Sequence, residues 1–140
     1  MYVFNHPLNM IFICVLLHLI ADYVLQGGLA SLKQRSWWTA KLESIRKPED
    51  RTTDIIKAWK LYQYDFICAL MCHALMWSLV TFLPLMWKVH PLVFAGIVGG
   101  NMIVHAIVDD LKANRCCINL WVDQILHLVQ IVATVLIVMY

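Results

Sequence analysis

Four apolar segments, each close to 20 residues long, account for most of this sequence of 140 residues. A helix of about 20 mainly apolar residues crosses the hydrocarbon core of a bilayer, which is ~30 Å thick. Inside that core every backbone N–H and C=O group must be bonded within the chain, so such segments fold as helices. We therefore predict an all-α fold, an integral membrane four-helix bundle that forms one transmembrane domain. The expected spans are residues 7–26, 66–87, 91–109 and 118–140, with a helical loop at the cytoplasmic surface over residues 27–64.

The composition agrees with a location in the membrane. Hydrophobic residues make up 61% of the sequence and charged residues only 14%, whereas a soluble domain carries roughly 25% charged residues. A small soluble protein could not bury this much apolar surface, and no nucleic-acid-binding motif is present. We therefore expect membrane lipid, and no nucleic acid, as a partner. The five cysteines lack the spacing of a disulfide framework and are expected to act mainly as small buried side chains.

The basic residues predict the orientation of the chain. Ten of the 11 Lys and Arg residues lie between the first and second or the third and fourth expected spans, and only Lys88 lies on the opposite side. Basic residues concentrate in cytoplasmic loops. We therefore expect both termini on the non-cytoplasmic side of a bacterial inner membrane or an equivalent membrane.

The loop over residues 27–64 has an internal pattern of its own. Trp37 and Trp38 stand beside basic residues, as in segments that lie on a membrane surface. Residues 46–51 form a polar run that predicts a turn, and residues 54–64 have the amphipathic spacing of a helix that leads into the second span.

Ionisable side chains interrupt the apolar segments at regular positions. Three histidine–aspartate pairs with four-residue spacing are His18–Asp22, His105–Asp109 and Asp123–His127. This spacing places both members of a pair on one helical face. Ionisable groups are costly in hydrocarbon, so they indicate a functional site.

These side chains fall at matching depths. With a rise of 1.5 Å per residue, four histidines, one from each span, lie roughly 10–14 Å from the cytoplasmic ends of their helices. His73 is the histidine of the second span. The three aspartates lie one turn nearer the cytoplasm. The sequence therefore predicts a layer of imidazoles inside the membrane and a layer of carboxylates on the cytoplasmic side of it.

Imidazole and carboxylate together suit zinc, manganese or iron better than calcium or magnesium. We expect one or two divalent metal ions, zinc before manganese or iron, with the ligands His18, Asp22, His73, His105, Asp109, Asp123 and His127. The candidate catalytic groups are Asp22, Asp109 and Asp123, and the candidate substrate-binding groups are Gln26, Lys33, Lys112, Arg115 and Gln124. A proton or ion relay and a structural hydrogen-bond network are the alternative interpretations of this layer.

Three functions are compatible with such a site. The first is a metal-dependent hydrolase that cleaves a phosphoester or acyl bond of a lipid-like substrate entering between helices. The second is a transporter of metal ions or protons, and the third is a structural or regulatory membrane protein in which a metal holds the helices together. Gly96, Gly99 and Gly100 would let helices approach closely, so a homodimer through this face is a further expectation.

Three blocks of the sequence resemble a family of small bacterial and phage membrane proteins known as domain of unknown function 3307. The blocks are residues 17–26 (LHLIADYVLQ), 105–112 (HAIVDDLK) and 122–127 (VDQILH), together with His73 and Lys33. The resemblance implies a small membrane protein with a shared His/Asp site, and it implies no established activity. The stretch from Lys41 to Tyr64 is longer than is usual in that family.

Overall fold

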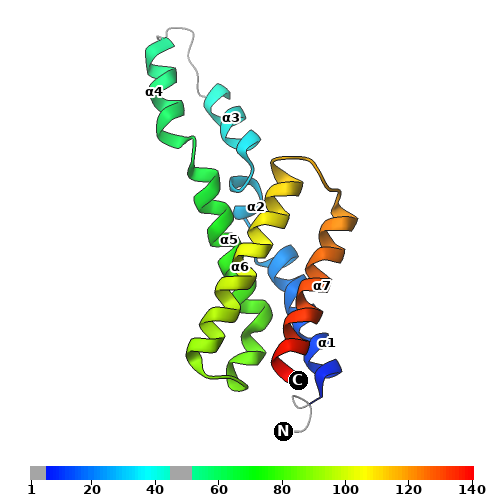
Figure 1. Ribbon diagram of the computed structural model, residues 1–140. Coiled ribbons are helices and arrows are strands. Elements are labelled where there is room, and N and C mark those ends of the chain that lie inside the picture. Colours follow the sequence, from blue (N-terminus) through cyan, green and yellow to red (C-terminus); the bar gives the residue numbers. More distant parts are fainter. Residues whose placement is uncertain (1–5, 45–51) are drawn as a thin grey trace.

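The computed structural model describes residues 6–44 and 52–140, and within these ranges the chain is helical and has no strand (Figure 1). In chain order the elements are α1 (Pro7–Leu19), η2 (Ile20–Val24), α2 (Leu29–Leu32), α3 (Arg35–Ser44), α4 (Thr52–Tyr62), α5 (Asp65–Phe82), η3 (Leu83–Trp87), α6 (Pro91–Ala113) and α7 (Leu120–Met139). Four stretches are long and apolar enough to cross a membrane: Pro7–Val24, Ile56–Trp87, Pro91–Ala113 and Leu120–Met139. The all-α prediction is confirmed for the part of the chain that the structure describes, and each predicted span has its helix.

The first span does not run as a regular helix to Gln26. α1 begins at Pro7, where the ring of His6 accepts the backbone N–H of Leu8 at 3.3 Å. After Leu19 the chain widens into the π-turn η2, in which the N–H of Leu25 donates to the carbonyl of Ile20 at 2.9 Å. Single π-turns inside α-helices are frequently found at functional sites. This one carries Asp22, which is buried.

The segment between the first two spans is helical, with the elements α2, α3 and α4. Figure 1 shows α3 and α4 side by side beyond the end of the long helices, with α4 leading into α5. The Trp38 and Tyr62 rings stack with centroids 6.0 Å apart. The predicted amphipathic helix over residues 54–64 corresponds to α4, whereas the predicted polar turn over residues 46–51 lies outside the described residues.

The third span is about one turn longer than expected. α6 continues past Asp109 to Ala113. Lys112 therefore lies three residues after Asp109 on the same helix, a spacing that brings side chains together. α7 starts two residues later than expected, because the Asn119 side chain caps it by accepting the N–H of Val122 at 2.9 Å.

The long helices pack against one another in a closed order: α1 contacts α5 and α7, and α6 contacts α5 and α7. Near the end of the bundle where α1 begins and α7 ends (Figure 1), they enclose an apolar core that includes Met10, Trp77, Phe82, Leu85 and Ile131. The buried histidines and aspartates lie toward the other end of this core. Apolar side chains also cover the outer faces, as lipid contact requires.

The exposure of the cysteines differs from expectation, and the glycines of the expected dimer face do not test the predicted homodimer. Of the five cysteines only Cys14 is buried, so the expectation of buried cysteines is wrong for the other four, Cys68 and Cys72 on α5 and Cys116 and Cys117 after α6. A Cβ added at Gly96, Gly99 or Gly100 would meet no atom within 4 Å. Packing within this chain therefore does not need these glycines, and the homodimer stays a prediction.

Candidate metal site

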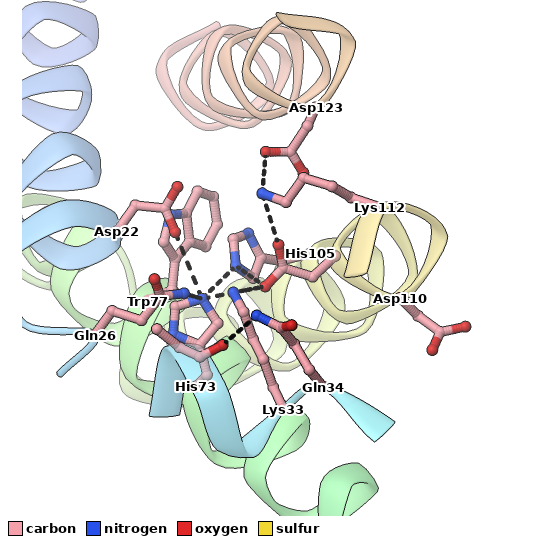
Figure 2. A network of polar contacts seen from close by, with 12 residues as sticks. Asp22, Gln26, Lys33, Gln34, His73, Trp77, His105, Asp110, Lys112 and Asp123 are labelled. Atoms are coloured by element: carbon pink, nitrogen blue, oxygen red, sulfur yellow. Dashed lines mark hydrogen bonds and ion pairs between the residues drawn. The ribbon is translucent and has the colours of Figure 1, made fainter. Parts of the chain in front are cut away.

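The site centres on the Nε2 atom of His73, in the third turn of α5 (Figure 2). This atom lies 3.5 Å from Oδ1 of Asp22, 3.2 Å from Oδ2 of Asp109 and 3.2 Å from Nε2 of His105. The Asp109 oxygen is in turn 3.6 Å from Nε2 of His105. Four buried side chains from η2, α5 and α6 thus direct one atom each toward a common point.

Hydrogen bonds do not account for every close contact within this group, although Lys33 donates to Oδ2 of Asp109. A neutral imidazole carries one N–H, and a carboxylate oxygen can only accept. His73 Nε2 can therefore donate to only one of its three neighbours, and the amide of Gln26 is a fourth neighbour at 3.2 Å. A cation at the centre would instead be attractive to every member of the group.

The spacing of the four atoms fits a metal ion. Ligand bonds of about 2.0–2.2 Å place neighbouring ligand atoms roughly 3.0–3.5 Å apart, depending on coordination geometry. Four separations within the group are 3.2–3.6 Å. Asp22, His73 and His105 also offer ligand atoms that all lie within 4.8 Å of one another. Buried imidazole and carboxylate groups here could therefore hold a metal ion.

A second group of potential ligands shares members with the first. His105, Asp109 and His127 offer atoms within 4.8 Å of one another. Nδ1 of His105 lies 3.2 Å from Nδ1 of His127, and Nε2 of His127 lies 3.5 Å from Oδ1 of Asp123 without forming a hydrogen bond. Oδ1 of Asp109 is likewise buried without a hydrogen-bond partner.

The tautomers of these two histidines are coupled. Between the two Nδ1 atoms there is room for one proton, so only one of the rings keeps a free lone pair on Nε2. If Nε2 of His105 binds an ion, its Nδ1–H donates to His127, and the remaining proton of His127 faces Asp123. This arrangement favours one ion at the first group, with His127 and Asp123 as the supporting partners that orient a metal-bound histidine.

His18, also predicted as a ligand, does not direct a ring nitrogen at this group of four atoms, because both of its ring nitrogens are bonded elsewhere. The indole N–H of Trp77 donates to Nδ1 of His18 at 2.8 Å, so the proton of this imidazole is on Nε2. Nε2 in turn donates to Oε1 of Gln124 at 3.1 Å. The Gln124 amide donates to Oδ2 of Asp22 at 3.1 Å and to Oδ2 of Asp123 at 3.0 Å. His18 and Gln124 therefore orient two carboxylates and have no lone pair directed at an ion.

Two lysines form ion pairs with two of the three carboxylates. Nζ of Lys33 lies 2.5 Å from Oδ2 of Asp109, and the side chain is only 5% exposed. Nζ of Lys112 lies 2.5 Å from Oδ2 of Asp123 and 3.6 Å from Oδ1 of Asp109 (Figure 2). With the Gln26 amide oxygen turned toward His73, that oxygen accepts from both Nε2 of His73 and Nζ of Lys33.

Arg115 is the one predicted substrate-binding residue that lies apart from this cluster. Its Nε donates to Oδ2 of Asp110 at 2.8 Å, and its side chain is 67% exposed. Asp110 points away from the cluster in Figure 2 and also accepts from Asn114.

Two polar residues near the site were not singled out from the sequence. The Trp77 indole stacks on the His105 ring with centroids 4.0 Å apart. Its position one turn after His73, in mid-span rather than at an interface, was the available signal. Asn101, one turn before His105, accepts from the side chains of Gln130 and Thr134 at 2.8 and 3.1 Å. The side chains of Asn101, Gln130 and Thr134 thus form hydrogen bonds mainly with one another.

No family model, curated protein or solved structure matches this chain. The resemblance to domain of unknown function 3307 therefore stays a prediction, and the interpretation of the site depends on its own geometry.

Proposed function

We propose that the chain is an integral membrane four-helix bundle that binds one divalent metal ion, zinc before manganese or iron, and acts as a metal-dependent hydrolase. The ion would be held by Asp22, His73, His105 and Asp109. The observation that carries the proposal is the set of four buried nitrogen and oxygen atoms, in which four of the six separations are 3.2–3.6 Å. The mixture of imidazole and carboxylate supports zinc, manganese or iron rather than calcium.

When bound, such an ion supplies a Lewis acid and an activated water for attack on a phosphoester or acyl bond. The protein groups around it support this chemistry. Oδ1 of Asp109 and Oδ1 of Asp123 are buried acceptors without a hydrogen-bond partner, so either could take a proton from water. Lys33 and Lys112 hold their positive charges beside these carboxylates, where the anionic part of a lipid-like substrate would be stabilised.

Metal content and hydrolysis together test the proposal. Wild-type protein purified in detergent should contain about one equivalent of metal by elemental analysis, and His73→Gln should lose it. Asp110→Asn is the matched control, because Asp110 pairs with Arg115 outside the site. Metal-loaded wild type should cleave chromogenic phosphate or acyl esters in mixed micelles, and His73→Gln should not. Wild type without metal would refute the site, and a metal-loaded protein without hydrolysis would refute the activity.

A purely structural metal is the second candidate function. It is favoured by the number of candidate ligands, because structural zinc sites typically have four protein ligands, whereas catalytic zinc sites typically have three and a water. In that case chelation should unfold or dissociate the helices while no ester is cleaved. Retention of the native circular dichroism and unfolding midpoint after chelation would contradict the structural role.

A further inference from the structure

We infer that Lys33 and Lys112 are exchangeable counter-ions of the candidate metal site, and that metal binding frees them to hold a phosphate group. This inference rests on the proposed metal site. It narrows the expected ligand from phosphoesters or acyl esters to anions of the phosphate class.

Lys33 and a metal ion would compete for the same atom. Oδ2 of Asp109 is one of the four candidate ligand atoms, and it is also the oxygen that accepts from Nζ of Lys33 at 2.5 Å. An ion bound to this oxygen would place a second positive charge within a few ångströms of the ammonium, where burial leaves little screening. The four-carbon stem of lysine can carry the ammonium to a new position. Metal binding should therefore displace Lys33 from Asp109.

Lys112 would be displaced less directly. Its Nζ lies between two carboxylates, 2.5 Å from Asp123 and 3.6 Å from Asp109. An ion bound to Asp109 would offset the negative charge of this carboxylate and weaken its attraction for Lys112. Lys112 would then keep only Asp123 as a strong partner. Its side chain is 25% exposed, so it lies closer to solvent than Lys33 and is suited to meet an incoming anion.

The charge balance of the buried cluster indicates that the bound group must carry a negative charge. Three carboxylates, Asp22, Asp109 and Asp123, face two ammonium groups, which leaves a net charge of −1. One divalent ion changes this to +1. A buried net positive charge is unfavourable unless an anion compensates it. A phosphate group supplies this charge together with acceptors for both lysines, whereas an uncharged acyl ester does not.

Isothermal titration with zinc and inorganic phosphate tests the inference. Protein loaded with stoichiometric zinc should bind phosphate about tenfold or more tightly than zinc-free protein, and phosphate should tighten zinc binding by the same factor, because coupling between two ligands is reciprocal. Lys33→Met should bind zinc about tenfold more tightly than wild type, because the competing cation is gone, and should lose most of the coupling to phosphate. Lys33→Arg keeps the charge and should keep both properties.

Arg115→Met is the matched control. It removes a positive charge from the same end of the molecule, but from a side chain that contacts only Asp110 among the described ion pairs. Its zinc affinity and phosphate coupling should equal those of wild type. Gel filtration and circular dichroism identify variants that do not fold, and Lys112→Met, with a partly exposed side chain, then gives a second measurement of the coupling.

The source of the phosphate is tested with lipid. Zinc affinity is measured in nanodiscs of phosphatidylcholine with and without phosphatidic acid, and in phosphatidylcholine with inorganic phosphate. If zinc affinity rises only with phosphatidic acid, the bound phosphate is that of a lipid headgroup. If zinc affinity rises with both phosphatidic acid and inorganic phosphate, the site accepts any accessible phosphate. Zinc binding that is indifferent to both phosphate sources, or unchanged in Lys33→Met, would overturn the inference while leaving the metal site intact. Failure of wild type to bind zinc at all would overturn both.

Discussion

The ion pair between Lys33 and Asp109 makes the most discriminating prediction about stability. The Asp109 side chain is fully buried and that of Lys33 is 5% exposed. Removing one partner of a buried ion pair costs about 3–5 kcal/mol, because the other charge is left without compensation. Ordinary polar contacts between membrane helices contribute only about 0.6 kcal/mol on average. The loss of unfolding free energy in Asp109→Asn therefore shows whether the pair behaves as a buried ion pair or as an ordinary polar contact between membrane helices.

We expect Asp109→Asn to lower the free energy of unfolding of metal-free protein by about 3 kcal/mol. Lys33→Met in the Asp109→Asn background should recover about 2 kcal/mol, since the uncompensated ammonium is then absent. The assay is denaturant unfolding in mixed micelles with a chelator present, with all four members of the double-mutant cycle measured. Asp110→Asn is the control and should cost at most about 1 kcal/mol, because its partner Arg115 is 67% exposed.

Two results would refute this reasoning. If Asp109→Asn costs no more than Asp110→Asn, the pair is not a buried charge pair in the membrane. If the two substitutions at Lys33 and Asp109 are additive, the groups do not interact, and the competition proposed between Lys33 and a metal ion loses its basis.

Three further predictions concern other parts of the chain. Trp77→Phe removes the N–H that His18 accepts at 2.8 Å and should destabilise the protein by about 1–3 kcal/mol in denaturant unfolding, because a buried acceptor is left unpaired; an unchanged midpoint would contradict the assigned proton positions. Gly27 has a φ of +48°, so Gly27→Ala should cost about 1–2 kcal/mol by the same measurement, whereas Gly28→Ala, at φ −63° with open space around the added Cβ, should cost less. The exposed pair Cys116–Cys117 should react with a membrane-impermeant maleimide only in vesicles that expose the cytoplasmic face, and labelling from the opposite face would reverse the predicted orientation.

Some properties of this protein follow from the sequence alone. Runs of about 20 apolar residues leave the backbone no alternative to helix in hydrocarbon, so the all-α fold and the four potential spans were predictable. The four-residue spacing of the His–Asp pairs and the matching depth of the side chains predicted that four histidines and three aspartates would come together, and His73, His105, Asp22 and Asp109 do lie around one point. Periodicity and rise per residue are properties of a single helix, and together with the predicted orientation they were sufficient to place these side chains at one level.

The distinction between candidate ligands and the residues that orient them depends on tertiary structure alone. His18 and His105 look equivalent in the sequence, since each precedes an aspartate by four residues. In the fold, Trp77 from another helix donates to His18 and commits its second nitrogen to Gln124, while His105 keeps an atom directed at His73. Lys33 likewise reads as an orientation signal in a loop, yet it lies buried against Asp109. Proton positions and charge pairing depend on which side chains from different helices meet, and helix spacing along one chain does not contain that information.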